Sequence, residues 1–535
     1  EPPEMLGALA DLLGNAGRHR EALAFWDRLV TVRPDLADAH LNRAITASNA
    51  GNHALAVEAA DAGLKRFPGH ARLLAAKAMA LKNAGRIEES LACFDKAVAA
   101  EPGRALTRHN QAVALRAARR FDEACSAYAE AARLGMDGAQ FHANWAAAAL
   151  EAGDVPRAVD LYERALKDDP QHDETLQALT RIHIEYRTGE DPFGHFANLA
   201  GLKPEDPNVW IRWANALALN RDYAAAAKVA ADGARRHPAS ADLPLLVLFS
   251  EGMAGDPAAP ARELVSRLAD QPDNELLWAT VSQLALRGGI PEAAEKAASR
   301  LVDKYPYHQS GWSILGLAWR VLGDDREHWL CDYERLVMAV DVTPPDGELS
   351  PAEYADVIAG ALLKRHNTLA APGNQSLRHG TQTGGALFDD PDPLIQQFRE
   401  AVSIAAARAV ATLPDDPAHP FLSRKSDKFR FSGSWSVRLQ SGGGHHVPHF
   451  HSEGWMSSAY YAQLPPADQE SRSRREGWIE FGRPPAIFNL DLEPRRVIEP
   501  AVGRLVLFPS YMWHGTVPFG RGERLTAAFD YQPLD

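Results

Sequence analysis

Prolines at a fixed spacing constrain the fold of this chain more than any other feature of its sequence. Eight of them lie on one register of 34 residues that only Met136 interrupts: Pro34, Pro68, Pro102, Pro170, Pro204, Pro238, Pro272 and Pro306. Glycines follow the same period, at Gly17, Gly51, Gly85, Gly153, Gly289 and Gly323. About 17 residues with helical apolar spacing lie between each glycine and the next proline. The pattern predicts helix pairs that stack into a solenoid, because one pair cannot bury its apolar stripe alone.

Small residues recur at two further positions of this register, where they let the helices of a pair approach closely: Ala44, Ala78, Ala112 and Ala146, then Ala22, Ala56, Ser90, Ala124 and Ala158. Together with an aromatic residue such as Trp26, Phe94 or Tyr162 and the closing proline, the period resembles the tetratricopeptide repeat. The resemblance covers residues 1–340 and implies an all-α superhelix of about nine repeats. Residues 186–195 fit the pattern less well, and we expect an irregular repeat there.

The composition of the 535 residues is that of a globular protein, with 46% hydrophobic and 24% charged residues. We expect no membrane span, since no run of 18 apolar residues occurs. The net charge of −13 argues against a nucleic-acid partner. Three separated cysteines, at 93, 125 and 331, exclude a disulfide framework and favour a reducing, cytoplasmic location. The chain begins at Glu1, which leaves open the removal of a leader.

The repeat pattern ends near residue 340, and different periods follow. Residues 342–347 are typical of a linker, and helices over 351–366 and 392–413 flank a polar loop at 368–390. From residue 428 the apolar period changes to two. Short strands are expected at 429–439, 456–463, 478–481, 486–490, 504–508 and 525–531.

We therefore predict a multidomain α + β chain. It consists of the repeat superhelix over 1–340, a linker and supporting helices over 341–427, and a double-stranded β-helix over 428–535. The last of these is a jelly-roll or cupin-like barrel, because many short strands separated by glycine and proline turns are typical of that architecture.

Four histidines lie within seven residues, at 445, 446, 449 and 451. In an extended segment residues i and i+2 face the same way, so His449 and His451 share a face, and Glu453 follows on it if the strand continues. Two imidazoles on one face can bind a divalent metal when a third ligand comes from elsewhere. We expect His514 to be that ligand, because it follows a buried strand at an abrupt turn. His445 and His446 are interpreted as structural or as part of the pocket rim.

A strand that returns from His514 would carry Arg524 into the barrel, with Thr526 on the same face. A buried guanidinium needs an anionic partner, and a dicarboxylate cosubstrate would supply one.

These residues resemble the 2-oxoglutarate and Fe(II)-dependent oxygenases, in the branch that is often fused to tetratricopeptide repeats. The resemblance covers residues 345–535 and depends on the two adjacent histidines, the Ser-Ser-Ala-Tyr-Tyr strand, residues 503–510, His514 and Arg524. It implies Fe(II), 2-oxoglutarate and O2, with His449 and His514 as metal ligands. It also implies that Arg524 and Thr526 hold the distal carboxylate of 2-oxoglutarate, to which Tyr461 could donate a hydrogen bond.

One position departs from the family pattern of His-x-Asp/Glu and a distal His, because residue 451 is a histidine. The metal ligands are then either His449, His451 and His514, or His451, Glu453 and His514. We favour the first set because it leaves a short turn before the strand with Tyr461, and the second remains open.

The expected activity is hydroxylation of a peptide or protein side chain that the repeats recruit. Two alternatives stay open: a non-catalytic scaffold whose jelly roll only binds a metal or ligand, and an oxygenase for a small or carrier-bound molecule. The repeats can also act as a spacer or form a homodimer. We expect Trp435 and Trp513 in the core, and residues 374–381 in a lid or a packed loop.

Overall fold

The structure is a computed structural model that describes residues 2–271 and 273–534. The chain divides into two compact units, residues 1–179 and 180–535, and the boundary lies inside helix α11 (Asp173–Glu185). None of the described helices has both the length and the hydropathy needed to cross a bilayer.

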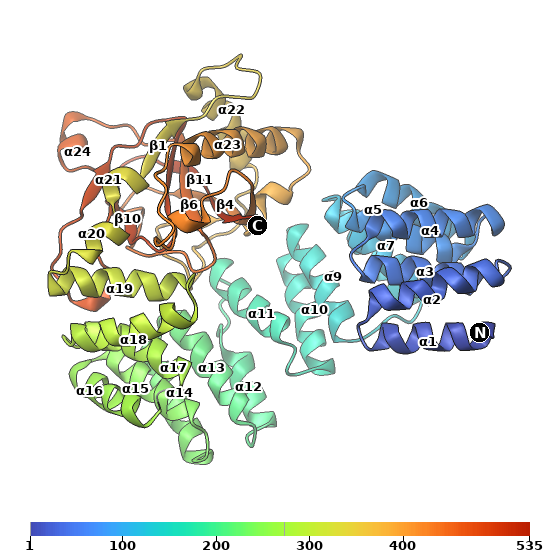
Figure 1. Ribbon diagram of the computed structural model, residues 1–535, viewed down its shortest axis with the longest axis horizontal. Helices are drawn as coiled ribbons and strands as arrows, with labels where there is room; N and C mark the ends of the chain where they lie inside the picture. The colour runs from blue at the N-terminus through green and yellow to red at the C-terminus, as the bar shows by residue number, and fades with distance from the viewer. Residues whose placement is uncertain (1, 272, 535) are drawn as a thin grey trace. The chain divides into compact units, whose positions relative to one another are not determined.

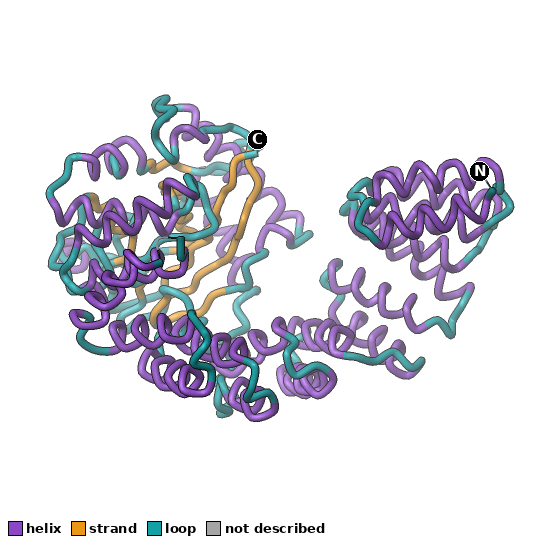
Figure 2. Tube along the Cα trace, turned by 60° about the horizontal axis from the view of Figure 1, so that its bottom comes forward, coloured by secondary structure: helices purple, strands orange, loops and turns teal. Residues whose placement is uncertain are grey.

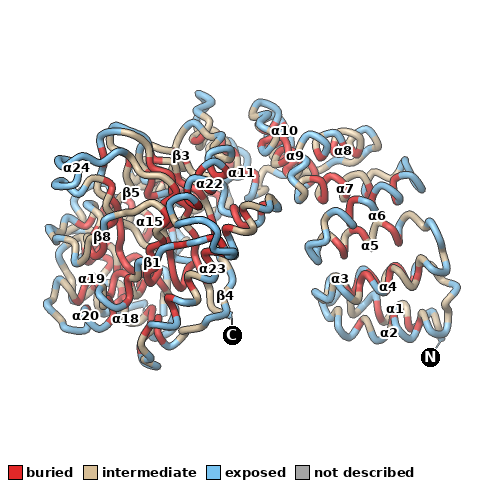
Figure 3. Tube along the Cα trace, turned by 90° about the horizontal axis from the view of Figure 1, so that it is seen from above, coloured by how far each residue is buried: buried red, intermediate tan, exposed pale blue. Residues whose placement is uncertain are grey.

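The first unit is a series of antiparallel helix pairs (Figure 1). Its helices are α1 (Pro3–Asn15), α2 (His19–Val32), α3 (Ala37–Asn49), α4 (His53–Arg66), α5 (Ala71–Asn83), α6 (Ile87–Ala100), α7 (Ala105–Ala117), α8 (Phe121–Arg133), α9 (Ala139–Glu151) and α10 (Val155–Asp168). Each helix buries one face and exposes the other (Figure 3). The small residues of the register lie on the buried faces, as at Ala44 and Ala56, which are at most 1% exposed.

The turn glycines explain where the helices end. Gly17, Gly51 and Gly85 have φ angles of 74°, 79° and 77°, a left-handed conformation that costs glycine little. At three positions of this register that lack glycine, Arg119, Arg187 and Arg221 adopt the same conformation, with φ angles of 60°, 51° and 66°. The turn geometry is thus kept even where the residue type is not.

The repeats continue in the second unit. Its helices before the sheet are α12 (Gly194–Leu202), α13 (Pro207–Leu219), α14 (Tyr223–Arg236), α15 (Asp242–Ala254), α16 (Ala258–Asp270), α17 (Glu275–Arg287), α18 (Pro291–Lys304), α19 (Gln309–Leu322), α20 (Arg326–Leu330) and α21 (Tyr333–Leu336). The expected irregular repeat coincides with a longer connection before α12, which has only 9 residues where α14 has 14.

The strands lie side by side in the C-terminal part of this unit (Figure 2). They are β1 (Met338–Asp341), β2 (Leu377–Arg378), β3 (Gly380–Gln382), β4 (Phe429–Leu439), β5 (His445–His446), β6 (Met456–Gln463), β7 (Ile479–Phe481), β8 (Arg496–Ile498), β9 (Arg504–Pro509), β10 (His514–Thr516) and β11 (Arg524–Pro533). The main sheet has the order β1-β9-β6-β11-β4-β3 with antiparallel neighbours, and smaller sheets pair β10-β7-β8 and β2-β5. This is the antiparallel architecture that the sequence predicts.

Helices cover the outer face of the main sheet. These helices are α22 (Pro351–Leu363) and α23 (Pro393–Ala411), and the short helices η1 (Leu387–Asp389), η2 (Leu422–Arg424), η3 (Ala486–Phe488) and α24 (Gln469–Ser473) lie in loops. On β6, Tyr460 packs on Phe398 of α23 with ring centroids 4.8 Å apart, whereas the next residue, Tyr461, faces the interior of the barrel. One face of the strand therefore packs against the helix, and the other face lines the interior of the barrel.

The last repeats and the sheet share one hydrophobic core, which extends from Leu245 in α15 to Tyr531 in β11. Hydrogen bonds cross the same junction. Trp513 donates its indole N–H to the Ser313 carbonyl at 3.1 Å, and Tyr511 donates to the Leu330 carbonyl at 2.7 Å. Within this unit the end of the repeat array is a packed part of the barrel domain.

Two local expectations differ from the structure. The expected linker begins with a buried residue, Val342, whose N–H bonds to the Gly503 carbonyl, because β1 just before it is an edge strand of the main sheet. The expected strand at 486–490 is wrong: residues 486–488 form η3, and Asn489 is left-handed with a φ angle of 53°. The two prolines before η3 and this left-handed residue prevent ladder pairing.

Candidate functional site

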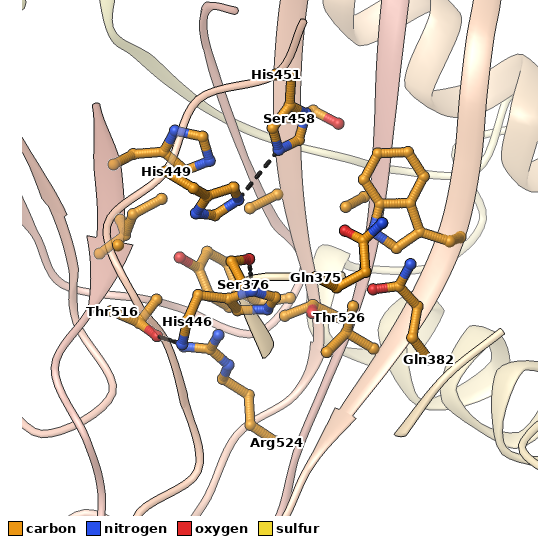
Figure 4. A pocket seen from close by; sticks show the side chains of 18 of the residues that line it. Gln375, Ser376, Gln382, His446, His449, His451, Ser458, Thr516, Arg524 and Thr526 are labelled. Carbon is orange, nitrogen blue, oxygen red and sulfur yellow. Dashed lines mark hydrogen bonds between the residues drawn. The ribbon is translucent and has the colours of Figure 1, made fainter. Parts of the chain in front are cut away.

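A pocket opens on the inner face of the main sheet, and the residues singled out in the sequence meet there. Its lining includes the imidazoles of His449, His451 and His514 together with Arg524 and Thr526 (Figure 4). Tyr461 also contributes to the wall. The three histidines come from the segment after β5 and from β10, and these two stretches are joined by a bridge between His449 and His514.

The three imidazoles converge closely enough to share one ion. One ring nitrogen from each lies within 4.8 Å of the others, and the Nε2 atoms of His449 and His451 are 3.2 Å apart. Metal–nitrogen bonds of roughly 2.1 Å at right angles would separate two ligand atoms by about 3 Å. The spacing therefore fits a divalent metal.

The other nitrogen of each ring is engaged in a way that fixes its tautomer. Nδ1 of His449 bonds to the Val447 carbonyl at 3.0 Å, and Nδ1 of His514 bonds to the Met512 carbonyl at 2.9 Å. Since a carbonyl only accepts, both Nδ1 atoms carry the proton. Nε2 of each ring then carries a lone pair that faces the centre of the group, as metal ligation requires.

Burial keeps the rings of His449 and His514 uncharged. Burial first and the neighbouring His451 second lower the pKa of His449 to about 3. Burial also lowers the pKa of His514 well below the usual range, with His449 acting in the same direction. Both imidazoles are therefore neutral at physiological pH, which is the form that binds metals.

Asp530 completes the set, and the sequence reasoning missed it. Its carboxylate accepts a hydrogen bond from Nδ1 of His451 at 2.6 Å and is 5% exposed. The period of β11 could have revealed it, because Arg524, Thr526 and Asp530 are separated by even numbers of residues and so share the inner face. The arrangement supplies a negative charge next to the imidazoles without a direct carboxylate ligand.

Glu453 lies outside this group. The chain turns at residues 452–453 instead of continuing as a strand, and Glu453 is exposed. Its carbonyl accepts a hydrogen bond from Gln532, which holds the segment in that turn. The structure thus brings together His449, His451 and His514 and leaves the carboxylate of Glu453 in solvent.

The opposite end of the pocket has the character of an anion site. Arg524 is 2% exposed, donates from Nη1 to the Gly477 carbonyl at 3.0 Å, and has no hydrogen-bond partner for Nε among the described residues. The hydroxyl of Tyr461 is also buried without a partner, and its ring centroid lies 5.8 Å from the guanidinium carbon. Unpaired buried donors are costly, and a carboxylate placed between them would satisfy both.

Two residues with other expected roles also line the pocket. His446, interpreted as structural or rim, bonds through Nδ1 to the Ser376 hydroxyl at 2.9 Å and stacks on His449 with ring centroids 5.6 Å apart. Trp435, expected in the core, is half-buried and forms part of the wall, because its strand face looks into the barrel. Trp513 is in the core as expected.

A second group of potential ligands, in the first unit, has a different character. Asp137, His142 and Asp168 also have ligand atoms within 4.8 Å of one another. The two carboxylates there are 76% and 36% exposed, and both already pair with the imidazole, at 3.4 and 3.0 Å. Such a cluster is typical of a solvated surface, whereas the barrel group is enclosed.

We expect Asp530→Asn to lower the affinity for a divalent metal by about 10- to 100-fold, because the variant loses the charged hydrogen-bond acceptor that orients His451. Competition of Mn(II) or Fe(II) with a chromogenic chelator measures the effect. Asp491→Asn, at an exposed position outside the site, is the matched control. Equal metal affinities in the two variants would show that Asp530 does not contribute to metal binding.

Three family profiles match the chain. Residues 433–530 match the family described as "Putative 2OG-Fe(II) oxygenase", residues 43–155 match "Psidin, N-terminal TPR repeats region", and residues 8–71 match "Tetratricopeptide repeat". No curated protein matches the chain.

Several solved structures that are similar to part of the chain are repeat proteins. A thermophilic TPR protein of Thermus thermophilus is 19% identical, with 33% of this chain and 96% of that chain covered and a TM-score of 0.30. YrrB, described as a TPR protein with an unusual peptide-binding site, is 18% identical over 32% and 89%, with a TM-score of 0.27. The C-terminal part of a repeat protein from Cytophaga hutchinsonii is 12% identical over 45% and 98%, with a TM-score of 0.33.

Proposed function

We propose that this chain, whose residues 433–530 match a 2OG-Fe(II) oxygenase profile and whose N-terminal residues match tetratricopeptide-repeat profiles, is an Fe(II)- and 2-oxoglutarate-dependent oxygenase that hydroxylates a peptide or protein side chain. The observation that carries the proposal is the meeting of three enclosed imidazoles with a buried guanidinium in one pocket. Either feature alone has structural explanations, but their combination fits a metal and a dicarboxylate side by side.

The metal would be held by His449, His451 and His514. Fe(II) with 2-oxoglutarate and O2 supplies the oxidising chemistry when bound, and three protein ligands leave positions for both. The residues of this chain keep the imidazoles of His449 and His514 neutral, aim their Nε2 atoms inward and place the Asp530 carboxylate behind His451. The absence of a direct carboxylate ligand is thereby partly offset by a nearby negative charge.

The cosubstrate would be oriented by its far carboxylate. Arg524 provides the charge, and the hydroxyls of Tyr461 and Thr526 provide further donors on the same wall. Because the guanidinium is almost fully buried, its attraction for a carboxylate is weakly screened by water. The apolar walls of the barrel exclude water from the reacting C–H bond.

Recruitment of a protein substrate is the proposed role of the repeats. Solenoids of this type present long surfaces to other chains, and here the final repeats are packed into the barrel domain. A non-catalytic scaffold is the alternative. The unpaired Arg524 Nε argues against it, because a barrel without a ligand gains nothing from burying a cation.

His446 is expected to strengthen cosubstrate binding. Its ring lies beside Arg524 (Figure 4), and its Nε2 has no hydrogen-bond partner among the described residues. We expect His446→Ala to weaken 2-oxoglutarate binding roughly tenfold, the usual effect of losing one hydrogen bond to a charged group. Calorimetry on the Mn(II)-loaded protein measures it, with His445→Ala, outside the pocket lining, as control. An unchanged affinity for 2-oxoglutarate would show that His446 only packs against its neighbours and does not bind the cosubstrate.

The proposed activity is tested by titrating the protein with Fe(II) and then 2-oxoglutarate without oxygen. We expect a visible absorption band that depends on both, followed by succinate release when oxygen is admitted. No band and no succinate from a folded protein would contradict the proposal, and a band without succinate would favour the scaffold.

A further inference from the structure

The pocket has two chemically different ends, and only one of them carries a charge. Among the described residues that line it, Arg524 is the single member with a permanent charge, and no aspartate, glutamate or lysine occurs. Asp530 does not line the pocket and is engaged by His451. The end of the pocket away from Arg524 therefore has no charged side chain with which to recognise a substrate.

Two glutamine side chains converge at that end. The carboxamides of Gln375 and Gln382 point toward the same part of the pocket (Figure 4). Neither side chain makes a hydrogen bond within the part of the chain that the structure describes. Each carboxamide offers two N–H donors and one carbonyl acceptor, so the pair can both donate to and accept from one ligand group.

The backbone holds both glutamines in place. Gln375 closes a turn by donating its N–H to the Pro372 carbonyl at 3.2 Å, and its own carbonyl accepts from Arg378 at 3.0 Å. Gln382 is the last residue of β3 and pairs with Val437 of β4. Because the backbone segments are already held, binding would have to order only the two side chains and not the loop, which limits its entropic cost.

Trp435 lies next to this pair and close to the proposed metal. It is on β4, lines the pocket and has its ring centroid 5.6 Å from that of His451. A flat aromatic surface beside two carboxamides suits a planar, uncharged group. The position of the indole next to His451 brings a group bound there near the reacting centre.

We propose that Gln375, Gln382 and Trp435 form a subsite for an uncharged amide of the substrate. The amide is the carboxamide of an asparagine or glutamine, or a peptide bond next to the oxidised carbon. A charged side chain would lose its hydration here without gaining a partner, whereas an amide finds both a donor and an acceptor. The proposal rests on the proposed function, because it assigns the substrate class of the same pocket.

An acidic substrate is the sharpest rival. Arg221, an exposed cation in the turn before α14, is near enough for its charge to contribute to the lowered pKa of His449. It lies outside the pocket lining. If Arg221 rather than the glutamines selected the substrate, a carboxylate would bind better than an amide.

The test uses the full chain loaded with Mn(II) and 2-oxoglutarate, and acetyl-Gly-Xaa-Gly-amide peptides in which Xaa is Asn, Ala, Asp or Lys. Paramagnetic broadening of the Xaa proton signals measures how closely each peptide approaches the metal. We expect the Asn peptide, or Asn and Ala equally, to broaden roughly tenfold more than Asp and Lys. Preference for Asn over Ala identifies a side-chain carboxamide, and equality identifies an amide that both peptides share, in the backbone or at the capped C-terminus.

The variant Gln375→Ala/Gln382→Ala should remove this preference, while Gln440→Ala, an exposed glutamine outside the lining, should keep it. Stronger broadening of Asp or Lys, no broadening of any peptide, or an unchanged preference in the double variant would overturn the inference. Water-proton relaxation checks the premise separately. If the wild-type chain binds neither Mn(II) nor 2-oxoglutarate, the proposed function fails, and the inference fails with it.

Discussion

Replacing His514 with alanine is expected to lower the affinity for Fe(II) by more than about 100-fold. The loss exceeds that of Asp530→Asn, because His514 is itself a proposed ligand whereas Asp530 only orients one. The two imidazoles that remain come from one short segment and cannot surround an ion. Succinate formation should fall to the background in parallel. Chelator competition under argon measures the affinity, and chromatography of the reaction mixture measures succinate.

A fold control is needed because His514 is 6% exposed and packs on Phe508 with ring centroids 4.4 Å apart. His514→Gln keeps more of the volume and should lose metal binding while circular dichroism stays native. His445→Ala removes a histidine of the same cluster that does not line the pocket, and it should bind metal normally. Full metal affinity in both His514 variants would mean that the ion is bound elsewhere.

The second large effect is expected from Arg524→Met, which keeps the length of the side chain but removes its charge. Truncating one partner of a buried charge pair costs about 2 to 5 kcal/mol, so 2-oxoglutarate should bind roughly 30- to 3000-fold more weakly. The affinity for the metal should hardly change, because the guanidinium is not part of the histidine group. Calorimetry on the Mn(II)-loaded protein separates the two effects.

Arg438→Met is the matched control for this prediction. Arg438 lies on β4, pairs with Glu523 at 2.8 Å and does not line the pocket. Because that ion pair is partly exposed, its loss should change little. A similar loss of 2-oxoglutarate affinity in both variants would point to a general effect of net charge. An unchanged affinity in Arg524→Met would show that Arg524 does not bind the carboxylate of 2-oxoglutarate.

The sequence predicted those parts of the fold that have a regular period. The prolines and glycines of the 34-residue register mark the helix ends, because they act through local backbone geometry. The strands at 429–439 and 456–463 have the predicted bounds, because the alternation of their side chains reflects one buried face. The register gives no sign of the division inside α11, since that depends on which distant residues pack together.

The site was predictable where residues follow a strand period and was not where the chain turns. Arg524 and Thr526 line the pocket together because they alternate on β11, and the same rule applied further along the strand would have found Asp530. The alternation does not extend to Glu453, because the chain turns after His451. Gln375 lies in the segment expected as a lid or a packed loop, but its meeting with Gln382 was not predictable, since it depends on a long loop held against β4.

The most direct test of the account is an iron-edge anomalous difference map from crystals grown with Fe(II) under argon. We predict one strong peak between the Nε2 atoms of His449, His451 and His514, with density for added 2-oxoglutarate reaching Arg524. A pocket without a peak, or a peak only at the exposed group of Asp137, His142 and Asp168, would contradict it.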